Sequence, residues 1–193
     1  TGTGKTITAL SLVASAARKG MRVLWLAHRE ELLKQPLRSL RGLWGDVGAM
    51  AGVVQAERDA SAAAVVFGSI DTLRGEARLA RYLAPGAPTL VVVDEAHHGA
   101  SASWTALISA LDAAGVAARG RPPYRLGLTA TPQRADGKSL AKLWTLAFSY
   151  SYMRAVKEGH LVPLTPRMER LPLLDLKRVG GGADYDADEL GVE

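Results

Sequence analysis

The sequence predicts an α/β fold built on a mainly parallel sheet. Apolar runs of strand length recur along the chain, and segments with helical spacing of their apolar residues lie between them. The length of 193 residues corresponds to one domain with at most a short appendage. We therefore expect strands and helices to alternate from the first residues to about residue 165.

The composition is that of a globular protein. The chain is 48% hydrophobic and 22% charged, which excludes a predominantly disordered chain, and its apolar runs are too short to span a membrane. The absence of cysteine excludes disulfides and thiolate metal sites and is compatible with the cytoplasmic location we expect. A net charge of +5 permits a polyanionic partner, although a solvated basic face explains it equally well.

The first half of the chain is predicted to alternate regularly. Helical spacing from Ile7 to Ala17 ends in the basic and glycine residues at 18–20, and the apolar run 22–27 is typical of a buried strand. Leucines at 32, 33, 37 and 40 predict a second helix that Pro36 must bend or restart. Residues 47–53 have no clear period.

The next elements follow from the same patterns. We expect a strand at 63–67, a helix at 70–83 and a strand at 89–93, where the sequence is continuously apolar. A helix at 103–113 and a basic connector at 115–123 precede a strand at 124–129.

The last part of the chain is less regular. Short helices are predicted at 140–148 and 153–157, and periodicity is lost from Pro163 onward. Glycines 180–182 followed by acidic residues indicate a mobile tail or a linker.

The chain opens on a glycine-rich segment typical of a phosphate-binding loop. Residues 1–6 match G-x-x-x-x-G-K-[ST] except for its opening residues, so we expect a segment of a longer protein. Closely spaced glycines let backbone N–H groups face phosphate oxygens; Lys5 would reach the β- and γ-phosphates and Thr6 would ligate Mg²⁺. The alternative is a ligand-free glycine turn. The predicted ATP-binding residues are Thr1, Gly2, Thr3, Gly4, Lys5 and Thr6.

Two adjacent carboxylates follow the predicted strand 89–93. Ligands of open α/β sheets bind at the carboxyl ends of strands, which places Asp94 to hold Mg²⁺ and Glu95 to polarise the attacking water. Adjacent acids can also simply begin a loop, but the phosphate-binding segment in the same sheet makes the functional interpretation stronger.

The ordered motifs of this chain resemble those of superfamily 2 helicases of the DEAD/DEAH type, in the branch similar to restriction subunits. The likeness covers about residues 1–165 and implies a three-layer RecA-like lobe of the P-loop NTPase class, with residues 166–193 as a linker or the start of the following segment. The segments that carry it are 1–6, Leu26-Ala-His-Arg-Glu-Glu-Leu32, Gly68-Ser-Ile-Asp-Thr-Leu73, Asp94-Glu-Ala-His97 and Leu128-Thr-Ala-Thr-Pro-Gln-Arg134.

The resemblance also implies roles for single residues. Lys5, Glu95 and His97 would act in catalysis, with His97 beside the γ-phosphate. The sugar-phosphate backbone of the nucleic-acid strand along which the protein moves would contact Arg29, Gly68, Ser69 and Thr72. The link between the nucleotide site and the nucleic-acid-binding face would be made by Thr129 and Thr131. Alternatives are an ion pair of Arg29 with Glu30 or Glu31 and hydroxyl capping by the threonines. The four tryptophans are expected in the core rather than stacked on bases.

These motifs together indicate one half of a motor. The resemblance implies the first lobe of an ATP-dependent helicase or translocase that acts on nucleic acid, DNA rather than RNA, and is active only with a second RecA-like lobe. Two alternatives stay open: a restriction-type translocase on duplex, and a nucleotide-gated clamp that does not hydrolyse ATP. A small-molecule kinase would share the phosphate loop but has no need of the segments around Ser69 and Thr129.

Overall fold

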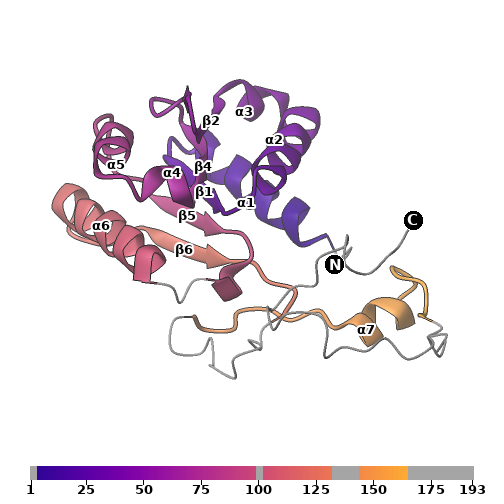
Figure 1. Ribbon diagram of the computed structural model, residues 1–193. Coiled ribbons are helices and arrows are strands. Elements are labelled where there is room, and N and C mark those ends of the chain that lie inside the picture. The colour runs from indigo at the N-terminus through magenta and orange to yellow at the C-terminus, as the bar shows by residue number, and fades with distance from the viewer. Residues whose placement is uncertain (1–3, 99–101, 132–143, 165–193) are drawn as a thin grey trace, which may run out of the picture. The chain divides into compact units, whose positions relative to one another are not determined.

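The computed structural model describes residues 4–98, 102–131 and 144–164 (Figure 1). The chain divides into two units, Thr1–Leu161 and Val162–Glu193. All described helices and strands belong to the first unit, and of the second only residues 162–164 are described. None of the described helices is both long and apolar enough to cross a membrane.

The core of the first unit is a six-stranded sheet with the order β3-β2-β4-β1-β5-β6. All neighbouring strands are parallel except the β2–β3 pair, which is antiparallel. The two central pairings place Trp25 opposite Phe67 on one side and Val92 on the other. The strands are β1 (Val23–Ala27), β2 (Ala51–Gln55), β3 (Arg58–Asp59), β4 (Val65–Ser69), β5 (Leu90–Val93) and β6 (Tyr124–Gly127).

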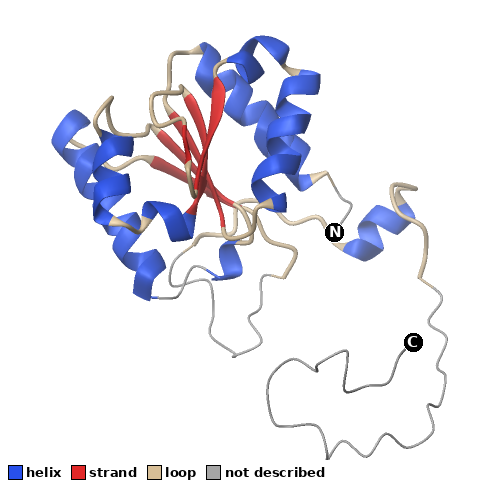
Figure 2. Ribbon diagram, turned by 45° about the horizontal axis from the view of Figure 1, so that its top comes forward, coloured by secondary structure: helices blue, strands red, loops and turns tan. Residues whose placement is uncertain are grey.

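Helices cover both faces of this sheet (Figure 2). On one face pack α1 (Lys5–Arg18), α2 (Glu31–Leu43) and α3 (Gly45–Ala49), and on the other α4 (Ile70–Leu73), α5 (Glu76–Leu83) and α6 (Ala102–Arg119). A 3-10 turn (Ala96–His98) follows β5, and α7 (Tyr152–Lys157) comes last. The predicted three-layer α/β architecture is confirmed.

Alternation along the buried strands divides the core in two. On β1, Trp25 faces the cluster under α1 and α2, where its ring lies 5.8 Å from that of Phe67, whereas Leu24 and Leu26 face the cluster under α4 to α6. All five residues of β1 are buried, as expected for a parallel strand covered on both faces. Trp25 and Trp104 are buried and Trp44 and Trp144 pack against the two clusters, so the prediction that the tryptophans belong to the core is confirmed.

The structure resolves two points that the sequence analysis left open in the first half. Of the two alternatives at Pro36, a restart is not seen: α2 continues through this residue, because Pro36, Leu37 and Leu40 are buried on its inner face and this packing offsets the lost hydrogen bond. Residues 47–53, which had no clear period, contain the end of α3 and the start of a β2–β3 hairpin.

The helix predicted over 70–83 is two helices. It breaks at Arg74 and Gly75, where the Gly75 N–H bonds the Thr72 carbonyl at 3.3 Å, so α5 takes a new direction.

The second half also departs from the prediction at two places. The helix α6 extends to Arg119, through Gly115, where an added Cβ would lie 2.9 Å from Pro123 Cδ and 3.0 Å from the Arg121 carbonyl. Glycine there permits close packing of the returning chain, so only the end of the predicted connector is a loop. The helix predicted at 140–148 is wrong for 144–148, which form neither helix nor strand; residues 140–143 lie outside the described part.

Candidate nucleotide and nucleic-acid site

The carboxyl ends of the parallel strands bring the predicted site segments to one edge of the sheet. We call this the carboxyl edge. β1 ends at Ala27, β4 at Ser69, β5 at Val93 and β6 at Gly127, and each is followed by a segment singled out in the sequence. In open α/β sheets this edge is where ligands bind.

The predicted phosphate loop leads into the amino terminus of α1. Gly4, the residue before the helix, has φ of 77°, a left-handed conformation that favours glycine. Lys5 and Thr6 form the first turn of the helix and are half-buried. Thr1, Gly2 and Thr3 lie outside the described residues, so their predicted role stays a prediction.

The carboxylate pair occupies a tight turn directly after β5. The Asp94 N–H donates to the Leu26 carbonyl at 2.9 Å, and Asp94 Oδ1 accepts the Glu95 N–H at 3.0 Å. Glu95 itself has φ of 51°, which is rare for a residue with a Cβ. Ala96 N–H donates to the Leu128 carbonyl at 2.8 Å and holds the turn against the segment after β6.

The electrostatics of Asp94 suit a cation site. Burial raises the pKa of Asp94 above its ordinary value and the neighbouring Glu95 charge adds to the rise, whereas the Glu95 N–H bond and the positive charge of Lys5 oppose it. Lys5 is therefore close enough to Asp94 for the two charges to interact. A divalent cation would favour the ionised carboxylate, and Mg²⁺ typically takes one or two carboxylates together with substrate phosphates.

His97 connects Glu95 to the segment after β6. Its Nδ1 lies 3.2 Å from Glu95 Oε2 and 3.0 Å from Thr129 Oγ1. The Thr129 hydroxyl donates to the Thr131 carbonyl at 3.1 Å and accepts the Thr131 N–H at 3.0 Å. Because the Thr129 hydroxyl donates its proton to the Thr131 carbonyl, its oxygen can accept a hydrogen bond from His97. The His97 tautomer with a proton on Nδ1 therefore satisfies the contacts with both Thr129 Oγ1 and Glu95 Oε2. The structure thus brings together His97, Glu95 and both predicted coupling threonines.

These residues fit the nucleoside triphosphate and Mg²⁺ that the sequence predicts. The left-handed turn at Gly4 precedes the amino terminus of a long helix, which is favourable for phosphate. Lys5, Thr6 and Asp94 provide the cation, the hydroxyl and the carboxylate that such a ligand requires.

Arg29 occupies an exposed position between β1 and α2. The neighbouring Glu30 forms its ion pairs with Lys34 at 2.7 Å and Arg58 at 3.5 Å, and within the described ranges Arg29 has no ion pair. The alternative that Arg29 pairs with Glu30 or Glu31 is therefore not seen, and its side chain is available to a ligand.

The segment from Gly68 to Thr72 makes contacts with other parts of the protein that the sequence did not reveal. Gly68 and Ser69 are buried at the end of β4, and an added Cβ on Gly68 would lie 2.4 Å from Leu73 Cδ1. The Thr72 hydroxyl accepts the N–H of Ala56 in the β2–β3 turn at 3.1 Å. These residues pack the end of β4 and bind the β2–β3 turn at the carboxyl edge. Their predicted contact with nucleic acid stays a prediction.

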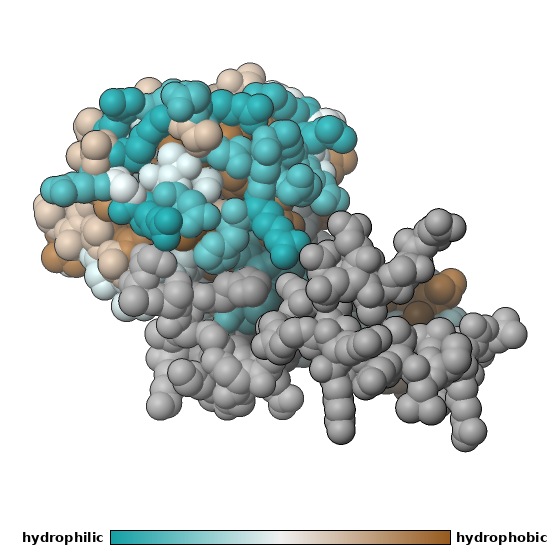
Figure 3. All heavy atoms as spheres, viewed as in Figure 1, coloured by the Kyte–Doolittle hydropathy of each residue, from teal (hydrophilic) through white to brown (hydrophobic). Residues whose placement is uncertain are grey.

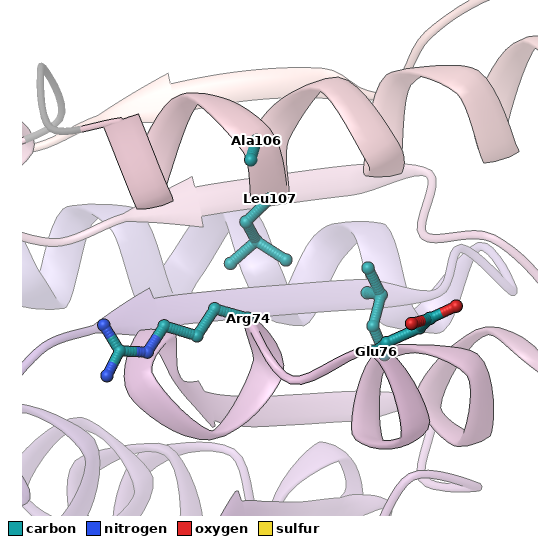
Figure 4. Close-up of a pocket in the computed structure, with 5 residues that line it drawn as sticks. Arg74, Glu76, Ala106 and Leu107 are labelled. Atoms are coloured by element: carbon teal, nitrogen blue, oxygen red, sulfur yellow. The ribbon is translucent and has the colours of Figure 1, made fainter.

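A shallow pocket of about 310 Å³ lies elsewhere, between α5 and α6 (Figure 4). Leu79, Ala106 and Leu107 make it largely apolar, and Arg74 and Glu76 extend in opposite directions at its rim. In the space-filling view, hydrophobic positions gather over α6, while hydrophilic side chains dominate the rest of the visible described surface (Figure 3). None of the predicted site residues lines this pocket.

Residues 1–134 match the family described as type III restriction enzyme, res subunit. The chain belongs to this family. Together with the fold, this confirms a superfamily 2 helicase-like first lobe in the restriction-subunit branch, and hence a lobe of the ATP-dependent helicase type.

Two individual proteins are similar to this chain. The 51.5 kDa protein of Lactococcus phage (isolate 7-9) is 29% identical over 136 residues, which are 70% of this chain and 24% of the phage protein. The helicase domain of Pyrococcus furiosus Hef shares the fold with a TM-score of 0.57 at 24% identity, over 70% of this chain and 29% of that chain. This res-subunit family chain thus spans less than a third of either relative.

Proposed function

We propose that the chain is the ATP-binding lobe of a motor that couples ATP hydrolysis to movement along DNA. The observation that carries the proposal is the contact chain at the carboxyl edge, from Glu95 through His97 to Thr129, next to Asp94 at the end of β5. Bound ATP and Mg²⁺ would supply the scissile phosphoanhydride and the cation that neutralises its charge.

The residues of the chain have distinct roles in this proposal. Gly4 and Lys5 bind the phosphates, and Thr6 and Asp94 hold the metal ion. Glu95, fixed by its backbone turn and by His97, orients and polarises the attacking water. His97 and Thr129 transmit the state of the nucleotide site to the segment after β6, since a shift of Glu95 must alter one of the two Nδ1 contacts.

Hydrolysis would require a second RecA-like lobe in the parent protein. That lobe would supply the arginine finger, an arginine that stabilises the charge of the transition state, and without it the rate of phosphoryl transfer falls by about 10³–10⁵. Residues 1–193 alone are therefore expected to bind ATP–Mg²⁺ weakly without turnover. The family description favours a restriction-type duplex translocase as a second candidate. A clamp without hydrolysis would have no use for the placement of Glu95.

The test compares Lys5→Ala with Glu95→Gln. Binding of a fluorescent ATP analogue with Mg²⁺ to residues 1–193 is expected to weaken strongly in Lys5→Ala and to persist in Glu95→Gln. In the full-length parent, DNA-stimulated ATPase should be lost in both variants. Equal loss of nucleotide affinity in the two variants would contradict the separate roles, and full ATPase activity in Glu95→Gln would refute Glu95 as the group that polarises the water. Nucleotide and DNA binding without any ATPase activity in the unaltered parent would favour the clamp.

A further inference from the structure

The β2–β3 hairpin reaches the carboxyl edge, although no pattern in the sequence predicted a hairpin there. Because β2 is parallel to β4 with Val54 opposite Gly68, its turn lies beside the end of β4. Two contacts fix the turn: the Ala56 N–H donates to Thr72 Oγ1 at 3.1 Å, and Arg78 donates to the Ala56 carbonyl. The first residue of β3, Arg58, therefore has a defined place next to a predicted nucleic-acid segment.

Arg58 also reaches the other predicted nucleic-acid segment. Its Nη1 lies 3.5 Å from Glu30 Oε1, so it extends across the end of β4 towards the loop after β1. Lys34 Nζ contacts the same carboxylate oxygen at 2.7 Å, and Arg29 precedes Glu30 in the chain. Two cations thus contact one carboxylate oxygen, and a third, Arg29, is the neighbouring residue in the chain.

This cluster is open to solvent. The Arg58 and Lys34 side chains are 57% and 50% exposed, and Glu30 is 40% exposed. Ion pairs at such exposure contribute little, so another anion can replace the carboxylate at small cost. Phosphate oxygens accept the two-pronged hydrogen bonds of a guanidinium particularly well. Glu31 and Glu57 lie next to the cluster in the sequence, so binding there would depend on these three cations rather than on a strongly basic surface.

We propose that Arg58, Arg29 and Lys34 form a phosphate-binding cluster through which the β2–β3 hairpin extends the nucleic-acid track along the carboxyl edge. The ligand is the phosphodiester backbone, and Glu30 holds Arg58 and Lys34 in place until a phosphate displaces it. This inference rests on the proposed function, because it assumes that nucleic acid crosses this edge.

The test measures how salt affects binding of residues 1–193 to fluorescein-labelled oligo(dT). Each phosphate contact contributes about 0.7 to the slope of log K against log salt on single strands. Arg58→Gln and Arg29→Gln are each expected to lower the slope by about 0.7 and to weaken binding about fivefold near 0.1 M salt. The matched control is Arg18→Gln, which removes the same charge from the Arg18–Asp46 pair at the opposite edge of the sheet and should leave the slope unchanged.

A second pair of variants tests whether removing a carboxylate tightens binding to oligo(dT). Glu30→Gln removes the competing carboxylate and should tighten binding, up to about the fivefold limit of one ionic contact. Asp46→Asn, which frees Arg18 in the same way, should not. Thermal unfolding of every variant identifies any that are poorly folded.

The outcomes separate the two proposals. If Arg29→Gln lowers the slope and Arg58→Gln behaves like Arg18→Gln, the hairpin cluster is refuted while the proposed function stands. If the unaltered chain shows no salt-dependent binding to oligo(dT), both fail. Equal tightening by Glu30→Gln and Asp46→Asn would reduce the effect to net charge and would also refute the cluster.

Discussion

Replacing Gly68 with alanine tests whether this glycine serves packing or ligand contact. The position is at the buried end of β4, and its new Cβ would lie 2.4 Å from Leu73 Cδ1 and 3.2 Å from Leu24 Cδ1. Both leucines are fully buried, so neither side chain has open space to move into. The expected result is loss of stability and a shift of α4, on which Thr72 lies.

The expected change in the free energy of unfolding is the balance of opposing effects. Overpacking a well-filled core costs about 1–3 kcal/mol, while the buried methyl group and the stiffer unfolded chain return part of this. We expect Gly68→Ala to lower the free energy of unfolding by about 1–2 kcal/mol and Tm by about 2–8 °C. Leu73→Val alone should cost about 1 kcal/mol, because it removes one buried carbon.

The double variant provides the decisive comparison. Valine lacks the Cδ1 atom that clashes, so Gly68→Ala with Leu73→Val should be more stable than the sum of the single losses by at least about 1 kcal/mol. Urea denaturation measures all four proteins. Additive losses would refute steric conflict as the reason for glycine. If the double variant regains stability but still binds oligo(dT) poorly, Gly68 contributes directly to nucleic-acid contact.

Three other perturbations have defined outcomes. Ala56→Gly should raise stability by about 0.5–1 kcal/mol in thermal unfolding, because Ala56 has φ of 47° and glycine adopts this region freely; an unchanged or lower Tm would contradict this. Arg22→Met should cost about 2–4 kcal/mol by urea denaturation, since its guanidinium donates to the carbonyls of Gly86, Ser61 and Tyr82 and lies 4.1 Å from the Tyr82 ring; a loss below 0.5 kcal/mol, as at an ordinary surface site, would be inconsistent with those bonds. The Ser61 hydroxyl and then Arg81 lower the pKa of Asp59 from 3.8 to about 2, so the unfolded state binds the proton more readily and stability should fall as pH drops from about 4 to 2. Asp59→Asn should flatten that part of the pH profile, and an unchanged profile would show that other groups are responsible.

The sequence predicted the parts of the fold that rest on local pattern. The run at 89–93 and the helix after Lys5 were correctly predicted, because continuous apolar residues and a glycine stop act within a few residues. The carboxylate pair could be placed for the same reason: a residue that directly follows a parallel strand must lie at the carboxyl edge.

The features that were missed depend on contacts between distant residues. The hairpin turn at Ala56 is held by Thr72 and Arg78, 16 and 22 residues away in sequence, and lacks the glycine or asparagine that signals a turn. Gly115 was interpreted as a helix end because the close approach of Pro123 is invisible in sequence. The break at Gly75 was missed because the apolar period continues across it.

The turn at Glu95 has a consequence for directed evolution of this lobe. A left-handed conformation costs a residue with a Cβ roughly 1–2 kcal/mol, and glycine at position 95 would avoid that cost. A library screened for expression or heat resistance alone would therefore enrich Glu95→Gly, which loses the proposed water-polarising group. Sorting such a library on nucleotide turnover in the proposed motor, rather than on yield, is what retains the carboxylate.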